Sequence, residues 1–367
     1  PGRCTQIFSC SQGGWCLASK KLSREKVRKA GKVLVHSSPG TVEYDQALEI
    51  AQQWRLAHVY PINTFQARLR HIAKNIPGSI VAQRLKRMPT IIDKLDRYPD
   101  MQLSTMQDIG GVRIIVPTIT AVWDVVSQYE NAPRFTHELE RKRDYITTPK
   151  SDGYRGVHLV YKYNNTLART QEAKDCKGLR VEVQIRTQEQ HIWSTAVETI
   201  GMVLHEPLKT RGGNEDWEEF FALMSSAVAI VEQQNVLEQH KYLRPVDIYR
   251  ALAKKAAIIN AIDIMKGYNL AAKEIQDNQR KNRSYYHIIE LNIDRKVVRI
   301  RAFSEKEQIE ALQEYSRLEQ ATQGDLAKNV VLVSMSELNK LQEAYPNYFL
   351  RMEAFLRRLE AIIDSVA

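Results

Sequence analysis

Two carboxylate residues in the middle of the chain, Asp108 and Glu182, have surroundings typical of a divalent-metal site. Asp108 precedes a short β-branched segment, and Glu182 lies in an alternating segment, 179–186, whose apolar residues face one way and polar residues the other. If the two strands are neighbours, the carboxylates can share a Mg²⁺ ion, which needs few protein ligands when substrate phosphates supply the rest. A turn residue and an exposed strand face are the alternative interpretations.

Basic side chains accompany both carboxylates and suit phosphate oxygens. Arg180 and Arg186 share the polar face with Glu182, and Arg113 follows Asp108 by five residues. A group upstream has the spacing of a loop that leads into a helix N-terminus, where backbone N–H groups and cations meet phosphates. A solvated basic helix is the alternative for this group, which comprises Arg84, Lys86, Thr90 and Lys94.

A Gly-containing turn at 150–153 separates two strand-like segments, 138–148 and 156–163, and predicts a hairpin. Its glycine would let the backbone approach a ligand closely. Tyr154, just past the turn, offers a ring on which a nucleobase can stack. Packing within the protein is the more ordinary role of such a ring.

The signatures of several common enzyme classes are absent from the sequence. It has no GxxxxGK[ST] loop, no GxGxxG, no GxSxG and no HExxH. It also has no His-Asp dipeptide, which metal-dependent phosphohydrolases of the HD type would need. These absences leave phosphate chemistry on a small sheet as the leading hypothesis.

Composition sets the class of protein and its partners. The net charge of +10 favours polyanions, either nucleotides or nucleic acid. No apolar run is long enough to span a bilayer, so we expect no membrane partner. The four cysteines lack zinc-site spacing and fit a reducing cytoplasm. Positive charge concentrates near the N-terminus, at Lys20, Lys21, Arg24, Lys26, Arg28, Lys29 and Lys32.

Periodicity predicts an α+β fold in three parts: a disordered leader (1–19), a main domain (20–278) and a small C-terminal domain (280–367). The C-terminal part has a ββαβα pattern. In the main domain we expect strands at 111–116 and 179–186. We expect helices over 20–60, 63–74, 80–97, 119–129, 188–204, 216–240 and 245–278.

Four segments together resemble the synthetase domain of the RelA/SpoT family. They are QRLKRMPTIIDKL (83–95), MQDIGGVRII (106–115), RDYITTPKSDGYRGVHLVY (143–161) and VEVQIRTQEQHIWSTAVET (181–199). The resemblance implies a nucleotidyltransferase-like mixed sheet with flanking helices. It also implies Mg²⁺-dependent transfer of diphosphate from ATP to a ribose hydroxyl, an activity that catalysis by positioning and charge neutralisation can support.

The resemblance also implies roles for individual residues. Asp108 and Glu182 would hold Mg²⁺, with Glu182 also acting as the base. The ATP-binding residues would be Arg84, Lys86, Thr90, Lys94, Arg113 and Arg143, the adenine lying between Arg84 and Arg113. Lys150, Tyr154 and His158 would line the acceptor side, with Tyr154 stacking on the acceptor base.

Other segments, such as YPINTFQARLR (60–70) and EDWEEFFALMSSA (215–227), resemble toxic small alarmone synthetases of the CapRel-like fused toxin–antitoxin type. That resemblance implies transfer to the 3′-CCA end of tRNA, inhibition of translation, and antiviral defence triggered by a phage capsid protein. The C-terminal domain, similar to a zinc finger without ligands, would be antitoxin and sensor. Its Tyr345 and Tyr348 would hinder adenine binding.

Two other interpretations remain at this point. One is an alarmone synthetase that makes guanosine or adenosine tetra- and pentaphosphates. The other is an inactive binding module that keeps the fold, against which the full set of expected site residues argues. The basic segment at 20–32 favours a tRNA acceptor stem as partner, and no DNA partner is expected.

Overall fold

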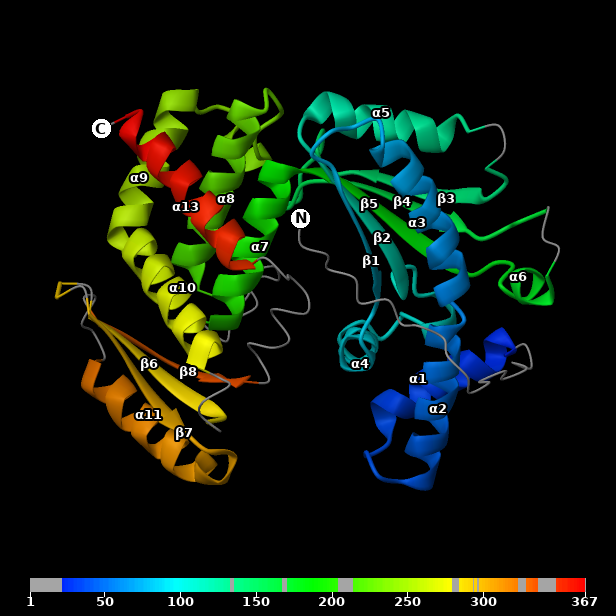
Figure 1. Ribbon diagram of the computed structural model, residues 1–367, viewed down its shortest axis with the longest axis horizontal. Coiled ribbons are helices and arrows are strands. Elements are labelled where there is room, and N and C mark those ends of the chain that lie inside the picture. Colours follow the sequence, from blue (N-terminus) through cyan, green and yellow to red (C-terminus); the bar gives the residue numbers. More distant parts are fainter. Residues whose placement is uncertain are drawn as a thin grey trace.

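Two β-sheets with surrounding helices organise the chain (Figure 1). The computed structural model describes residues 22–132, 135–166, 170–203, 214–278, 284–292, 294–295, 297–322, 328–335 and 348–366. Runs of helices lie before, between and after the strands, and the larger sheet contains both parallel and antiparallel pairs. The predicted α+β class with a mixed sheet is therefore confirmed. No helix in these ranges has both the length and the apolar character of a bilayer crossing.

The larger sheet brings the strands near Asp108 and Glu182 side by side. Its strands are β1 (Ile80–Leu85), β2 (Gly110–Val116), β3 (Glu138–Asp144), β4 (Val157–Lys162) and β5 (Arg180–Thr187). They lie in the order β1-β2-β5-β4-β3. The β2–β5 pair is parallel, whereas the other three pairs are antiparallel. The two strands are therefore neighbours, which is the condition for Asp108 and Glu182 to share an ion.

One face of the larger sheet is apolar and is covered by α3 (Val59–Ala73) and α5 (Ile119–Glu130). The apolar residues of β5 point to this face and are fully buried. At Gly110 the helix α3 approaches the strand β2 so closely that an added Cβ would lie 2.9 Å from a side-chain carbon of Ile62. The strict alternation in β5 turns Glu182 to the opposite, polar face.

The segment 80–97, predicted as one helix, is instead a strand followed by a helix. β1 pairs with β2 along its whole length, from Ile80 opposite Ile115 to Leu85 opposite Gly110. The helix α4 (Met88–Arg97) begins only after this strand, with a proline in its first turn. Pairing with β2 supplies the backbone hydrogen bonds of residues 80–85 and overrides their weak helical pattern.

Three helices and a short turn complete the N-terminal part. α1 (Arg24–His36) and α2 (Val42–Leu56) begin at serine and threonine caps, Ser23 and Thr41, whose side chains accept backbone hydrogen bonds. α1 packs against α2, α4 and the short turn η1 (Leu103–Thr105) at the lower right of Figure 1. A small helix, α6 (Gln171–Asp175), precedes β5.

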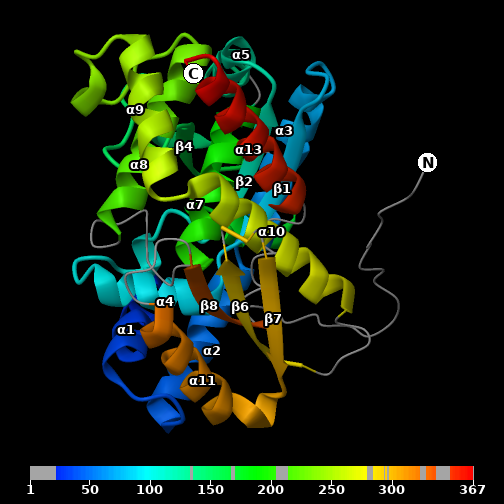
Figure 2. The same cartoon turned by 90° about the vertical axis from the view of Figure 1, so that its left-hand side faces the viewer.

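A second layer of helices lies beside the polar face of the sheet (Figures 1 and 2). It contains α7 (Gln188–Val203), α8 (Glu215–Val231), the short η2 (Glu238–His240), α9 (Pro245–Ile258) and α10 (Ala261–Asn278). The segment 245–278, predicted as one helix, is broken after α9. Asn260 has a positive φ of 50° there, a conformation that ends the helix.

The C-terminal residues divide between two places. β6 (Tyr286–Asn292), β7 (Val297–Phe303) and β8 (Lys328–Ser334) form the smaller sheet in the order β7-β6-β8. The turn η3 (Glu305–Glu307) and α11 (Gln308–Thr322) pack on it. The last helix, α13 (Tyr348–Asp364), instead packs in the second helical layer against α7, α9 and α10. The ββαβα order is as predicted, but these elements do not pack as one separate module.

Candidate active site

The polar face of the larger sheet collects most of the residues predicted to do chemistry. Residues paired across neighbouring strands point to the same face. Glu182 of β5 lies opposite Gly111 of β2, which in turn lies opposite Arg84 of β1. One row further along, Arg113, Gln184, His158 and Arg143 lie side by side on β2, β5, β4 and β3.

Asp108 lies just before β2 and is held by two lysines. Lys86 Nζ and Lys94 Nζ each donate a hydrogen bond of 2.9 Å to the same carboxylate oxygen, Oδ2. The other oxygen, Oδ1, is buried and has no hydrogen-bond partner among the described residues. Burial acts to raise the pKa of Asp108, but the two ammonium groups outweigh it and lower this pKa.

The carboxylates fit a Mg²⁺ ion that is bound partly by substrate. An unpartnered, buried carboxylate oxygen such as Asp108 Oδ1 is a suitable hard ligand. Within the described residues no three acidic, His or Cys side chains form a closed metal cage. Asp108 and Glu182 are near enough for the charge of Asp108 to oppose ionisation of Glu182. Two carboxylates completed by phosphate oxygens and water match the preference of Mg²⁺.

Glu182 lies within a chain of hydrogen bonds that runs from Tyr154 to Arg113. His158 Nδ1 lies 2.9 Å from Glu182 Oε1, and Gln184 Nε2 donates to Oε2 at 2.8 Å. The other ring nitrogen of His158 lies 2.7 Å from the Tyr154 hydroxyl. Burial acts to raise the pKa of Glu182, but the hydrogen bond and charge of His158 lower it overall. Both hydrogen bonds favour the carboxylate form, which a metal ligand or proton acceptor needs.

The expected acceptor residues are in contact with one another. Lys150 Nζ lies 4.8 Å from the ring centroid of Tyr145 and 5.1 Å from that of Tyr154. Tyr145 also meets His158 edge-on, with ring centroids 5.4 Å apart. Sequence reasoning missed Tyr145, although it lies inside the segment 143–161 that carried the resemblance. A base that stacks on Tyr154 must first displace the Lys150 ammonium.

The 150–153 turn is anchored to protein rather than open to a ligand. Gly153 has a positive φ of 93°, and an added Cβ would lie 2.8 Å from the Trp193 ring. Ser225 donates a 2.6 Å hydrogen bond to the carbonyl of Gly153. The predicted pairing of the flanking strands is confirmed, but β3 and β4 stop well short of the turn. The glycine thus serves close packing against α7 and α8, which fixes the position of Tyr154.

A cluster of arginines faces α7. Burial, together with the nearby charges of Arg186 and Arg84, lowers the pKa of Arg113 to about 9. Burial likewise lowers the pKa of Arg186. Glu198 of α7 is close enough for its charge to oppose the lowering of both pKa values. Sequence reasoning missed Glu198, because only the fold brings α7 to this face. The cluster gives the site a positive potential that suits a polyanion.

Some predicted residues have other roles or lie elsewhere. Arg180 was predicted to suit phosphate, but both its Nε and Nη2 donate to Glu140, at 2.6 and 2.8 Å. Thr90 is exposed in the first turn of α4, on the same helix as Lys94. Outside the described residues lie Lys20, Lys21, Tyr345 and the side chain of Tyr348.

The described basic residues of the N-terminal segment lie on α1. Lys26, Lys29 and Lys32 are exposed there. Arg24 donates to the carbonyl of Gly178 at 3.0 Å. Arg28 forms an ion pair with Glu25. Part of this predicted nucleic-acid surface is therefore already engaged within the protein.

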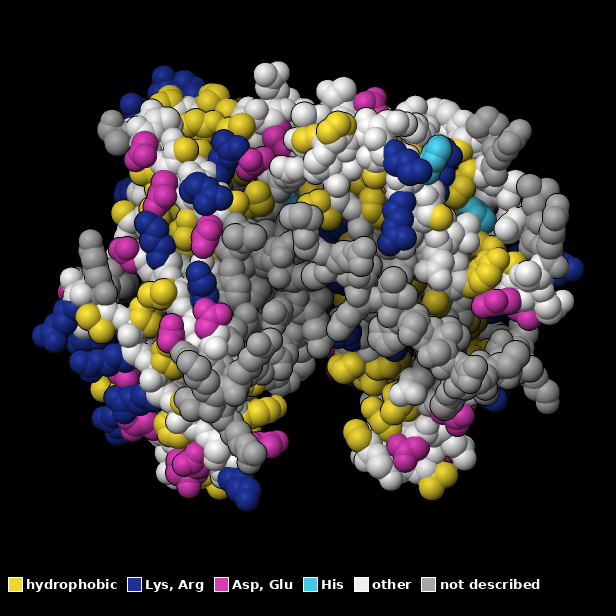
Figure 3. All heavy atoms as spheres, viewed as in Figure 1, with side chains coloured by type: hydrophobic (Ala, Val, Ile, Leu, Met, Phe, Trp, Pro, Cys, Tyr) yellow, Lys and Arg dark blue, Asp and Glu magenta, His cyan; other side chains and the backbone are white. Residues whose placement is uncertain are grey.

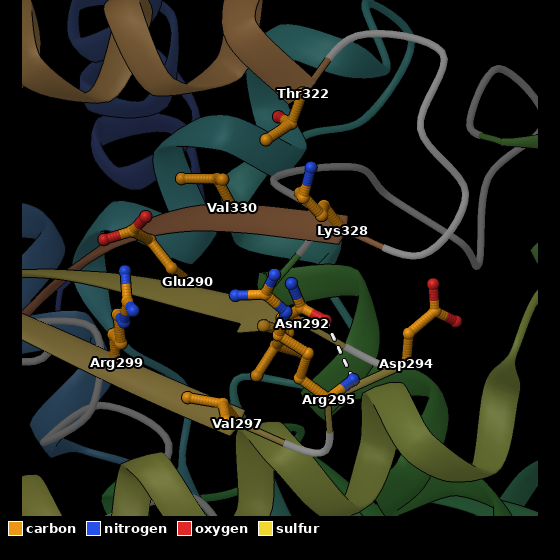
Figure 4. Close-up of a pocket in the computed structure, with 10 residues that line it drawn as sticks. Glu290, Asn292, Asp294, Arg295, Val297, Arg299, Thr322, Lys328 and Val330 are labelled. Carbon is orange, nitrogen blue, oxygen red and sulfur yellow. Dashed lines mark hydrogen bonds between the residues drawn. The ribbon is translucent and has the colours of Figure 1, made fainter.

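A separate hollow of about 490 Å³ lies on the smaller sheet, and neither Asp108 nor Glu182 lines it (Figure 4). Acidic and basic side chains both line it, and Glu290 already forms an ion pair with Arg301. None of the predicted site residues is among its lining residues, which are Glu290, Leu291, Asn292, Asp294, Arg295, Val297, Arg299, Thr322, Lys328 and Val330.

Residues 83–200 match the family described as "Region found in RelA / SpoT proteins". This span contains Asp108, Glu182 and the polar face of the sheet. The match shows that the chain contains a RelA/SpoT region, as the four segments predicted.

Curated relatives are similar over this same region. GTP pyrophosphokinase YjbM of Bacillus subtilis is 34% identical over 121 residues, which are 32% of this chain and 54% of that protein. GTP pyrophosphokinase YwaC of the same organism is 31% identical over 121 residues, covering 30% and 52%. A GTP pyrophosphokinase of Haemophilus influenzae is 27% identical over 194 residues, covering 51% and 23%. The chain thus spans about half the length of the two Bacillus relatives.

Solved structures of small alarmone synthetases also align with the chain. Small alarmone synthetase 1 from Bacillus subtilis aligns with a TM-score of 0.42 and 23% identity, covering 50% of this chain and 92% of that one. A GTP pyrophosphokinase family protein from Streptococcus pneumoniae aligns with a TM-score of 0.40 and 21% identity, covering 53% and 91%.

Proposed function

We propose that the chain is an ATP-dependent pyrophosphokinase, which transfers a diphosphate group to a ribose hydroxyl. The observation that carries this proposal is the pairing of β2 with β5, which places Asp108 and Glu182 at one polar face with lysines and arginines around them. The match of residues 83–200 and the printed names of the curated relatives support the same activity.

The donor side follows from the charges at this face. Arg84 and Arg113 would hold the adenine, while Lys86, Lys94 and Thr90 would contact the phosphates near the first turn of α4. Arg143, which lies opposite His158 in the sheet, would contact phosphate from the acceptor side. When bound, Mg²⁺ would neutralise the polyphosphate charge between Asp108 and Glu182.

The transfer is an in-line displacement at the β-phosphorus of ATP. The ribose oxygen forms a bond to this phosphorus while the bond to the oxygen that bridges to the α-phosphorus breaks, and AMP leaves. Glu182 takes the hydroxyl proton from the acceptor. His158 hydrogen-bonds the carboxylate of Glu182 and orients it for this step.

The acceptor that the relatives favour is a purine nucleotide, because three of them are named GTP pyrophosphokinase. The base would stack on Tyr154 once Lys150 moves off the ring and contacts the acceptor phosphates instead. The products would be alarmones of the guanosine or adenosine tetra- and pentaphosphate kind.

The 3′-CCA end of tRNA is the second candidate acceptor, and three exposed lysines of α1 favour it. In the view of Figure 3, basic and acidic side chains are interspersed over the described helices on the left. The described part of that face therefore shows no uniformly basic surface of the kind that would favour tRNA. On this candidate the enzyme is a translation-inhibiting toxin. The C-terminal residues restrain it through Tyr345 and Tyr348, and a phage capsid protein releases it.

One labelling experiment decides between the acceptors. The full chain is incubated with Mg²⁺ and γ-³²P-ATP, and with either GDP, GTP and AMP or deacylated tRNA. Label that appears on the free nucleotides supports the first acceptor, and label only on tRNA supports the second. No labelled product under either condition, with no AMP released, would refute the pyrophosphokinase proposal.

A further inference from the structure

We infer that Lys86 and Lys94 act as place-holding cations, which keep a free divalent ion off Asp108 and admit the metal only together with a polyphosphate. The inference deepens the proposed function and rests on it. Both ammonium groups bind one oxygen of Asp108 at 2.9 Å, while the other oxygen is buried and unpartnered within the described residues.

The ion pairs are well shielded from water. The side chains of Lys86, Lys94 and Asp108 are 7%, 27% and 19% exposed. At such sites solvent and salt screen charges weakly, so the interaction is stronger than that of a surface pair. Two ammonium groups share this one carboxylate and Arg84 adds positive charge nearby, while the second carboxylate, Glu182, is hydrogen-bonded by His158. A lone Mg²⁺ or Mn²⁺ ion that approaches Asp108 therefore meets repulsion from both lysines.

A nucleotide changes this balance because its phosphates carry several negative charges. Lys86 comes from the connection between β1 and α4, and Lys94 comes from α4 itself, so both approach Asp108 from the helix expected at the phosphates. A lysine ammonium on its flexible stem can turn from Oδ2 to a phosphate oxygen. The carboxylate that this exchange frees then accepts the metal that the phosphates bring.

The exchange predicts positive coupling between metal and nucleotide. If the lysines leave Asp108 only for phosphate, nucleotide raises the affinity for metal, and metal raises the affinity for nucleotide by the same factor. If neutral donors held the carboxylate instead of lysines, a metal ion without nucleotide would meet no repulsion at this site. The lysines thus make the site selective for the metal–nucleotide complex over either component.

Binding of Mn²⁺ to the full chain tests this, with free Mn²⁺ followed by electron paramagnetic resonance. The nucleotide is the ATP analogue AMPCPP, whose α,β-methylene bridge blocks transfer, and its own Mn²⁺ binding is subtracted in a protein-free titration. We expect AMPCPP to tighten Mn²⁺ binding at least tenfold. Equal Mn²⁺ affinity with and without AMPCPP overturns the inference without the need for any variant.

Variants assign the effect to the lysines. Lys94→Met keeps a side chain of similar length and removes the charge. Because one of the two ammonium groups that repel the ion is then absent from a partly buried site, Mn²⁺ alone should bind about tenfold more tightly. AMPCPP should bind more weakly, and Lys94→Arg should restore weak Mn²⁺ binding. Lys162→Met is the matched control, because Lys162 also pairs with carboxylates, at 3.3 and 3.5 Å, and is 30% exposed. It should bind Mn²⁺ as the native chain does.

Two outcomes contradict the assignment: a folded Lys94→Met chain that binds Mn²⁺ alone no more tightly than the native one, or a Lys162→Met chain with the same gain as Lys94→Met. Lys86→Met is a second test if circular dichroism shows that Lys94→Met is unfolded. The readout needs neither acceptor nor transfer. A chain that shows the coupling but transfers no diphosphate would refute the proposed function alone.

Discussion

Arg358 in α13 donates two hydrogen bonds to the carboxylate of Glu189, the second residue of α7. This ion pair joins the last described helix to the helix that directly follows the strand of Glu182. Apolar contacts support the same joint, because Phe355 of α13 is fully buried and meets the rings of Phe220 and Phe221. The C-terminal helix is thus a structural part of the layer beside the active site.

We expect Phe355→Ala to lower the free energy of unfolding by about 3–5 kcal/mol, because it leaves a cavity in the core of the helical layer. Urea unfolding followed by circular dichroism measures this. Leu270→Ala is the control, since Leu270 on α10 is 59% exposed and its loss should change stability by less than about 0.5 kcal/mol. Similar small changes in both variants would contradict the role of α13 in the core.

We expect Glu182→Gln to lower the rate of AMP release by about 10²–10⁴-fold, because a general base contributes on that order and the amide cannot accept the proton. Single-turnover measurement with the best acceptor gives the rate. Glu138→Gln is the control, because Glu138 lies on the edge strand β3 and its side chain is 61% exposed. A Glu182→Gln chain with native rate would remove this residue from the mechanism.

Acid should weaken the fold through Glu140. Its hydrogen bonds with Arg180 lower the pKa of Glu140 from 4.5 to about 2. A carboxyl whose pKa is depressed in the folded state stabilises the protein above its unfolded pKa. That contribution is complete above about pH 4.5 and is lost as the pH falls towards 2. In urea unfolding at pH 7 and pH 3, Glu140→Gln should therefore lose stability mainly at pH 7.

A stability difference between native and Glu140→Gln chains that stays the same at both pH values would contradict this pairing. A second variant, Arg180→Met, tests the corrected role of Arg180. Because Arg180 is engaged with Glu140 rather than phosphate, we expect Arg180→Met to leave the affinity for AMPCPP unchanged within about twofold. It should still lower stability, as Glu140→Gln does.

The ring and the hydroxyl of Tyr154 should have separable effects. Tyr154→Leu should raise the KM for the acceptor by about tenfold or more, because stacking of a base on an aromatic ring contributes on the order of 1–3 kcal/mol. Tyr154→Phe keeps the ring and loses the hydrogen bond to His158, so acceptor KM should stay near native. Initial rates at varied acceptor concentration distinguish the two. A large KM increase in both variants would contradict stacking as the role of the ring.

Sequence alone predicted the strands whose pattern is local. Alternation in 179–186 defined β5 and the face of Glu182, and the full burial of Val181, Val183 and Ile185, each after a half-buried polar residue, confirms it. The helix predicted for residues 80–85 was wrong, because these side chains are mostly exposed and show no clear alternation of burial. Its strand state depends on pairing with β2, which is distant in sequence. The break at Asn260 was missed because the chain there has neither glycine nor proline.

The site residues divide in the same way. Asp108, Glu182, Lys86 and Lys94 could be singled out from the sequence because they lie in short, recognisable segments. Their partnerships could not, because the contacts of Asp108 with both lysines and of Arg180 with Glu140 depend on side-chain geometry. Glu198 was missed because it lies on a helix brought to the sheet by tertiary packing. The sequence therefore indicated which residues could do chemistry, whereas the fold determined which of them form ion pairs.

The parallel pairing of β2 with β5 also has a consequence for how the chain acquires its activity. Parallel neighbours need a long crossover, and here α5, β3 and β4 all lie between the two strands in the chain. Contacts between such distant segments form slowly, because the entropy of closing the intervening loop must be lost first. A nascent chain that includes Asp108 but not yet β5 lacks the strand that carries Glu182. Asp108 and Glu182 therefore come together only after β5 has been made and has paired with β2.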